Sequence, residues 1–455
     1  SRRMTGHAPL KRSLGLGAVA ALVIGNMIGS GIFFTPGELA SVAQHAWQVH
    51  FIWALSGFIT LCGALTLAEL CTMLPQAGAT FHIITEGFGP FWGFLLVWLE
   101  LWVTGPGAIA SSAVAFGDFL HRSVPILPGV TAVGWGAAAI LFFAGINLAG
   151  VQWGGRTQVL LTTAKVLGIG GLIIGGLFLA PATADASPAP TAGGMEGLSG
   201  FLRFTGLGIA AVLFTYDGWI DVTNVAGEVR RPERDFPLGL GLGVAALTVL
   251  YLVVNVAYLR VVPLSQMRAA PTAVASTLAT TAFGTGGGKM LTALMTISIF
   301  GALGGLVMTQ PRLFYTLAAS YHDPASATPR GFFGLLSRVS SRTAAPHGAI
   351  LFTTATSLVA LWFFGSFGRL VNFFIVPLQL ATIMMVGAIF RLRHRRRSTG
   401  YRTPGYPVTP VIYMVVVSGF VVSAVIFRPL EPLIGIALAA TGVPVYWRLR
   451  RKQSA

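Results

Sequence analysis

The chain has 455 residues, of which 54% are hydrophobic and only 10% are charged. A typical soluble domain carries roughly 25% charged residues, so this composition excludes a soluble enzyme and a disordered chain. The net charge of +16 is not accompanied by an aromatic-and-basic nucleic-acid module. It fits the excess of Lys and Arg in the cytoplasmic loops of membrane proteins, and we expect no nucleic-acid partner.

Twelve apolar segments follow one another along the chain. A helix that crosses a bilayer needs about 20 mostly apolar residues, so twelve spans account for a hydrophobic content of this size. We therefore predict an all-α polytopic membrane protein with twelve transmembrane helices and no separate soluble domain. The predicted spans are residues 14–42, 51–74, 90–120, 131–148, 154–180, 201–226, 236–262, 289–320, 348–364, 369–392, 410–427 and 430–449. Residues 181–200, rich in Pro, Ala and Gly, are predicted to form a loop.

The distribution of Lys and Arg predicts the orientation of the chain. With both termini in the cytoplasm, 22 of the 30 basic residues fall in inside segments and 7 in outside segments, and Lys165 lies within a span. Positive charge accumulates on the cytoplasmic side of membrane proteins. The pattern therefore favours two cytoplasmic termini in a multi-pass protein of the inner (plasma) membrane.

The first span contains a glycine-rich segment, Gly25-Asn-Met-Ile-Gly-Ser-Gly-Ile-Phe-Phe-Thr-Pro36. Each glycine inside a helix costs about 1 kcal/mol relative to alanine, so this segment favours an interrupted helix. Glycine also lets membrane helices pack closely. Taken alone, the segment leaves both interpretations open.

The sixth span carries Phe214-Thr-Tyr-Asp-Gly-Trp-Ile-Asp221, with two acidic residues in an apolar stretch. Charges inside a membrane are costly and are expected to face protein or water. Spans 1 and 6 are five spans apart, so a five-span repeat places its second copy upside down. Interrupted helices at matching positions of inverted halves indicate a transporter binding site near the midplane. Unpaired N–H and C=O groups there suit the carboxylate and ammonium of an amino acid.

Lys165 lies near the middle of the fifth span. A lysine at that depth is costly unless it is paired or loses its proton. Two interpretations stay open: a structural cation bound to an internal carbonyl or carboxylate, or a charge standing where another transporter binds Na⁺. For Glu69 and Glu100, the other buried charges, a structural hydrogen-bonding role is favoured over coupling.

In combination, these motifs resemble the amino acid–polyamine–organocation (APC) superfamily, and within it a bacterial form of the L-type amino-acid transporter branch. The resemblance covers residues 14–448 and rests on Ile28-Gly-Ser-Gly-Ile-Phe33 with Thr35-Pro36, Ala68-Glu-Leu70 with Met73-Leu-Pro75, Lys165, Phe214-Thr-Tyr-Asp-Gly-Trp219, Glu228 with Arg231-Pro-Glu-Arg234, and Tyr401-Arg-Thr-Pro-Gly-Tyr-Pro-Val-Thr-Pro410.

The resemblance implies a LeuT-like fold with two inverted five-helix repeats, spans 1 and 6 unwound. The repeats would cover residues 14–180 and 201–392, with spans 11 and 12 in residues 410–449 of a single transporter domain. It also implies alternating access and exchange of amino acids without sodium. The implied substrate-binding residues are Ile28, Gly29, Ser30, Gly31, Ile32, Phe214, Thr215, Tyr216, Asp217 and Tyr251. In this scheme Phe214 gates the outer side, and Lys165 contacts the unwound part of span 1 where sodium-driven relatives place a cation.

The compact Gly29-Ser30-Gly31 segment favours small or medium neutral L-amino acids as substrates. Proton-coupled symport remains an alternative, with Asp217, Glu100 or Lys165 carrying the proton. A membrane-embedded enzyme or a receptor is a remote alternative, because no nucleophile, base or metal set converges. We expect no cofactor and no metal. The loop between spans 3 and 4 lacks the cysteine through which eukaryotic light chains bond a heavy chain, so no disulfide-linked heavy chain is expected.

Overall fold

The structure is a computed structural model that describes residues 15–29, 31–74, 79–123, 129–149, 165–183, 197–223, 226, 229–320, 331–338, 346–395 and 400–454. These residues form helices and no strand, which confirms the predicted all-α class. Because no water in a bilayer core can satisfy backbone N–H and C=O groups, helices that pair these groups internally suit such an apolar chain.

Eight helices in the described residues are long and apolar enough to cross a membrane. They comprise α3 (Ala46–Met73), the run of α5 (Pro90–Leu99), η1 (Glu100–Thr104) and α6 (Gly105–Ser123), α11 (Pro232–Val261), α13 (Val274–Ser320), α15 (His347–Phe364), α16 (Phe367–Arg395), α17 (Val408–Phe427), and the run of α18 (Leu430–Ala440) and α19 (Gly442–Ser454). A ninth candidate is the pair α1 (Leu16–Met27) and α2 (Gly31–Ala40), which is bent by 51°.

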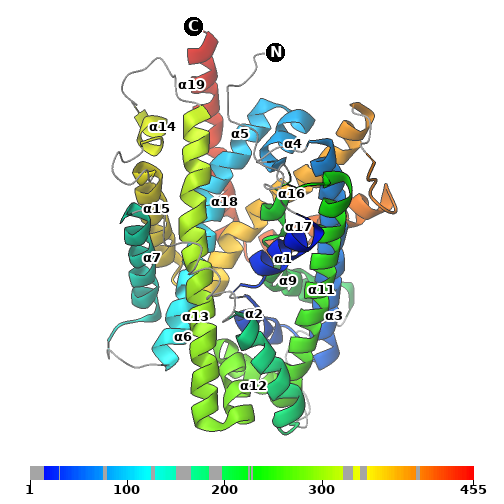
Figure 1. The fold of residues 1–455 in the computed structure, drawn as a ribbon, viewed down its shortest axis with the longest axis vertical. Coiled ribbons are helices and arrows are strands. Elements are labelled where there is room, and N and C mark those ends of the chain that lie inside the picture. Colours follow the sequence, from blue (N-terminus) through cyan, green and yellow to red (C-terminus); the bar gives the residue numbers. More distant parts are fainter. Residues whose placement is uncertain are drawn as a thin grey trace.

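Three shorter apolar helices lie in the regions of the predicted spans 131–148, 154–180 and 201–226: α7 (Ala132–Ala149), the helix Lys165–Leu179 that ends in η3 (Gly175–Leu179), and α9 (Gly197–Thr215). Short elements connect the others: α4 (Ala79–Phe88), α10 (Trp219–Thr223), α12 (Leu264–Ala269), η5 (Pro271–Ala273) and α14 (Gly331–Leu336). In Figure 1, α11 and α13 run nearly vertically on either side of α1 and α2, which occupy the middle of the molecule.

Helices α3 and α11 begin four or five residues before the predicted spans 51–74 and 236–262, in stretches that are not apolar. Before α3, the Gln48 side chain accepts a hydrogen bond of 3.0 Å from the His45 backbone N–H. The first residue of α11 is Pro232, whose missing N–H costs nothing in the first helical turn. Within α13, Gly284 has a non-helical backbone with φ of +66°, so residues 274–283 form a separate helical segment and the predicted span 289–320 lies beyond the break. Hydropathy finds the apolar middle of a span but not these polar ends.

Large apolar side chains are exposed on the outer faces of several helices. Trp362 of α15 is 81% exposed and Phe178 of η3 is 75% exposed. Exposed apolar surface of this kind marks contact with a partner or a membrane. Together with the lengths of the helices, it supports lipid around the bundle.

A buried carboxylate ties three distant segments together at the end where α16 stops. Glu69 of α3 is fully buried, and its Oε1 lies 3.2 Å from the Arg393 Nε of α16. Its Oε2 accepts hydrogen bonds from the backbone N–H and the hydroxyl of Thr403, at 2.7 and 2.6 Å. The Arg393 guanidinium also lies 3.9 Å from the centre of the Tyr406 ring. Glu69 thus makes hydrogen bonds of the kind that its predicted structural role requires.

Candidate functional site

Two helix breaks face each other in the middle of the molecule. Helix α1 ends at Met27, and Ile28 has an extended backbone with ψ of 94°. Helix α9 ends at Thr215, and a turn with Gly218 at φ +104° precedes α10. Both predicted interruptions therefore occur at the predicted places, although Ser30 lies outside the described residues.

The two breaks touch through residues that leave little room. A Cβ at Gly31 would lie 2.9 Å from Thr215 Cα, and one at Gly218 would lie 2.8 Å from the Asn26 carbonyl oxygen. The hydroxyl oxygens of Thr35 and Thr215 are 2.7 Å apart and form a hydrogen bond. Glycine is required here for close approach, and at Gly218 also for the left-handed backbone.

The carbonyl groups at the end of α1 accept hydrogen bonds from two side chains. The Lys165 ammonium, with 5% of the residue exposed, donates to the Ile28 carbonyl at 2.9 Å. The Tyr251 hydroxyl lies 2.8 Å from the Met27 carbonyl oxygen and 3.3 Å from that of Thr215. A helix carries partial negative charge at its C-terminus, so a cationic group is favourable there.

An aromatic cluster behind the breaks fixes the position of Tyr251. The rings of Trp53, Tyr216 and Tyr251 lie with centroids between 5.2 and 5.8 Å apart. The Tyr216 hydroxyl donates to the Trp53 carbonyl at 3.1 Å, and Tyr216 is fully buried. The Tyr216 side chain therefore packs into the core, and only its backbone belongs to the break.

The beginning of α2 presents backbone N–H groups beside this cluster. The first turn of a helix has N–H groups without intrahelical partners and a partial positive charge. Gly31 and Ile32 occupy that turn. The Tyr258 hydroxyl donates to the Ile32 carbonyl at 3.3 Å and so fixes the turn from the side of α11. This arrangement suits a carboxylate ligand.

Aromatic rings of α2, α9 and α16 pack against one side of the breaks. The Phe214 ring contacts Phe367 edge-on at a centroid distance of 5.2 Å and Phe374 at 5.8 Å. Phe34 of α2 stacks on Phe367 at 5.1 Å. Phe214 thus joins α9 to α16, with α2 packed on the same ring of Phe367.

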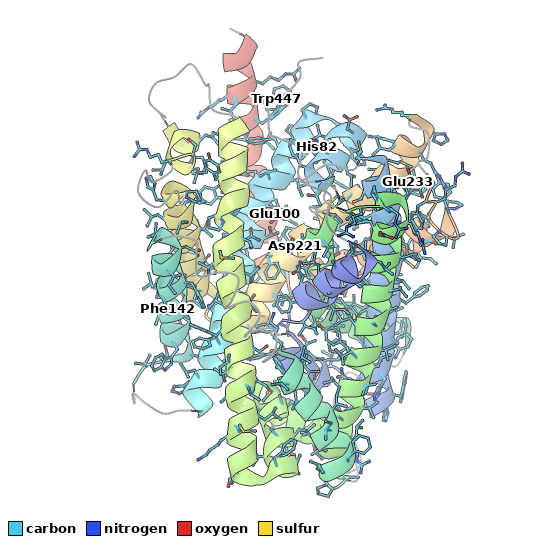
Figure 2. All side chains as sticks on the ribbon, viewed as in Figure 1. His82, Glu100, Phe142, Asp221, Glu233 and Trp447 are labelled. Carbon is cyan, nitrogen blue, oxygen red and sulfur yellow. The ribbon has the colours of Figure 1, made fainter. Side chains whose placement is uncertain are left out.

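Three carboxylates lie on the other side of the breaks. Glu100, Asp217 and Asp221 interact electrostatically, and Thr104 donates a hydrogen bond to Glu100. Figure 2 places Glu100 and Asp221 toward the end where α19 stops, and Asp221 is exposed. No group of three or more His, Cys, Asp or Glu residues in the described ranges is arranged to hold a metal ion. Three acidic side chains are thus gathered on this side of the breaks.

Most of the predicted site residues come together at the two breaks. The exceptions are Ser30, which lies outside the described residues, and the Tyr216 side chain, which packs into the core. The structure brings together Ile28, Gly29, Gly31, Ile32, Phe214, Thr215, Asp217, Lys165 and Tyr251 at the two breaks. Sequence reasoning missed Trp53 and Tyr258, which hold the site residues from behind. In a largely apolar span, nothing in the sequence marks an aromatic residue that supports a site. The one available signal was the spacing of Tyr251 and Tyr258, which lie about two helical turns apart and so share a face of the helix.

Comparisons with known proteins agree on one family. A family model described as "Amino acid permease" matches residues 14–447. The serine/threonine exchanger SteT of Bacillus subtilis is 30% identical, with 98% of each chain covered. The Asc-type amino acid transporter 1 of Mus musculus is 27% identical over 97% of this chain and 83% of its own. The human cystine/glutamate transporter is 28% identical over 96% of this chain and 85% of its own.

Proposed function

The chain belongs to the amino acid permease family of the APC superfamily, and from this premise we propose that it exchanges small or medium neutral L-amino acids across a membrane by alternating access. Its relatives are transporters rather than enzymes. Family membership and the apolar helices make it a multi-pass membrane transporter.

The observation that carries the proposal is the pairing of the two helix breaks. The first turn of α2 offers N–H groups for the substrate carboxylate, and the end of α9 offers carbonyl groups for its ammonium. Ile28, Gly29, Ser30, Gly31 and Ile32 form the first half of the site in this proposal. Phe214, Thr215, Tyr216 and Asp217 form the second, and Tyr251 joins them by contacting carbonyls of both α1 and α9.

The contact of Lys165 with Ile28 supports exchange without sodium. Carbonyl oxygens at a broken helix end are typical ligands for Na⁺ in transporters. Here a buried ammonium already donates to one of them at 2.9 Å. A second cation about 4 Å away would be repelled by about 4 kcal/mol at an effective dielectric of 20. We therefore propose that Lys165 replaces the sodium ion.

The transmembrane arrangement is proposed on the same basis. We propose that the eight long apolar helices, the bent pair and the three shorter apolar helices are the twelve spans. We propose a LeuT-like fold with inverted repeats at residues 14–180 and 201–392 in a single domain, and with both termini cytoplasmic. The similarity to the bacterial exchanger supports an inner-membrane location. No disulfide-linked heavy chain is part of the proposal.

The exposure of residues on the two sides of the helix breaks indicates which side of the site is open. Asn26 and Asp221, on the side of the carboxylates, are exposed, whereas Phe34, Phe367 and Phe374 on the opposite side are buried. With cytoplasmic termini, this corresponds to an inward-facing state with its outer side closed. In this proposal Phe214 is the outer gate.

Uptake into proteoliposomes tests the proposed function. Labelled serine, alanine and leucine would be offered to vesicles that are empty or preloaded with unlabelled amino acid, with and without Na⁺ and a pH gradient. We expect preloading to stimulate uptake strongly and Na⁺ to have no effect. Uptake into empty vesicles driven by the pH gradient would instead establish proton symport, and the absence of saturable uptake would overturn transport of these substrates.

The Phe214→Ala variant is expected to slow exchange about tenfold while the protein still inserts and folds. Phe214 makes two edge-on ring contacts, each worth about 0.5–1.5 kcal/mol beyond its buried area. Their loss destabilises the closed outer gate and so slows alternation. Exchange rates per folded transporter would be measured beside those of Phe178→Ala, whose ring is 75% exposed. Equal rates for the two variants would show that Phe214 is not the gate.

A further inference from the structure

A small pocket lies beyond the Phe214 and Phe367 contact, toward the ends of α2 and α17. It is lined by Thr35, Glu38, Ser41, Val42, Leu207, Phe367, Gly368, Val371, Asn372 and Arg428 and has a volume of about 40 Å³. One water molecule needs about 10–15 Å³ of the space that a water-sized sphere can occupy. This pocket therefore has room for about three water molecules. It adjoins the helix breaks through Thr35, but none of the described residues 26–29, 31 and 214–218 lines it.

Two opposite charges face this pocket without forming an ion pair. Glu38 comes from the end of α2 and Arg428 from the residue that follows α17, and the two interact electrostatically. Within the described part of the chain, neither side chain makes an ion pair or a hydrogen bond. By contrast, Arg369 and Glu431 in the same region pair at 3.1 Å. The helices therefore hold Glu38 and Arg428 apart across the pocket.

The remaining lining groups complete a site for a polar molecule with an apolar side. Asn372 is only 9% exposed and lines the pocket, and its side-chain amide has no hydrogen-bond partner among the described residues. Leu207, Val371 and Phe367 provide the apolar wall. An arginine guanidinium matches a carboxylate through two parallel hydrogen bonds. A carboxylate such as that of Glu38 matches an ammonium group.

We propose that this pocket is a second, outward-facing site that holds a small zwitterionic amino acid. The substrate carboxylate pairs with Arg428, and its ammonium pairs with Glu38. The small volume excludes bulky side chains, so serine, alanine and glycine fit the site better than leucine. This inference rests on the proposed transport function, because the second site would bind the transported substrate on the outer side of the Phe214 gate.

Counting bound substrate tests the second site separately from transport. Labelled L-serine would be equilibrated by dialysis against the purified full-length protein in detergent, up to saturation. We expect two sites per chain for the wild type and one for the variant carrying both Glu38→Gln and Arg428→Gln. Two sites are also expected for Arg260→Gln, because Arg260 is an exposed cation at the end of α11 that does not line the pocket.

A second variant removes the pocket without changing its charges. Gly368 lines the pocket, and a Cβ there would lie 3.5 Å from the Glu38 carboxylate, so Gly368→Val fills pocket space beside Glu38. We expect this variant to bind one serine per chain. A wild-type protein with one site, or variants that keep two, would overturn the second site and leave the proposed function intact. A wild-type protein that binds no serine, alanine or glycine would overturn both.

Discussion

Replacing Lys165 with alanine is expected to lower the exchange rate roughly ten- to a hundredfold. A hydrogen bond from a charged group contributes about 1.5–3 kcal/mol, and this one fixes the end of α1 beside the substrate site. Its loss leaves the Ile28 carbonyl, in a residue only 4% exposed, without its donor. Exchange would be measured in preloaded proteoliposomes, with the amount of folded protein determined by size-exclusion chromatography.

Sodium separates the two interpretations of Lys165. If Lys165 stands in place of a cation, the alanine variant regains a cation site, and replacing potassium chloride by sodium chloride restores part of the exchange. The matched control is Lys289→Ala, since Lys289 is exposed on α13; this variant should match the wild type in both salts. A lower melting temperature without any response to sodium would instead assign Lys165 a purely structural role.

Local composition predicted the apolar helices, and the matching positions of two disturbed segments, five spans apart, predicted the two breaks. Apolar runs of about 20 residues indicate spans because a helix of that length crosses a bilayer. The break after Met27 and the turn at Gly218 were predictable because glycines and buried acids are unfavourable in an apolar helix. Each of these signals lies within a single stretch of about 20 residues.

Contacts between distant segments could not be predicted in this way. Nothing in the run Arg391-Leu-Arg393 distinguishes the arginine that pairs with Glu69 from those that mark topology. Likewise, the motif around Phe214 does not reveal that Tyr216 turns into the core against Trp53. Both facts depend on which helices pack together. The pocket between Glu38 and Arg428 depends on packing in the same way, because its charges are 390 residues apart in the chain.

The second large effect is expected at Glu69, where substitution by alanine should strongly destabilise the fold. Removing one partner of a buried ion pair costs about 3–5 kcal/mol, because the other charge is left without compensation. Here the Thr403 N–H and hydroxyl also lose their acceptor. In the proposed arrangement α3 belongs to the first repeat and α16 to the second, so the variant also loosens the connection between the repeats. Melting temperature in detergent and exchange rate should therefore fall together.

An exposed ion pair provides the comparison that decides whether burial is responsible. The Glu431→Ala variant breaks the pair with Arg369, whose side chain is 45% exposed, and exposed pairs contribute about 1 kcal/mol or less. Its melting temperature should stay close to that of the wild type, whereas that of Glu69→Ala should fall several times further.

Glu69→Gln separates the parts of the network, because the amide oxygen can still accept from Thr403 while the charge opposite Arg393 is gone. We expect an intermediate melting temperature for Glu69→Gln, and combining it with Arg393→Gln should cost less than the sum of the two single changes. Strict additivity would show that the ion pair between α3 and α16 contributes nothing, and that the hydrogen bonds to Thr403 alone hold this end of the bundle together.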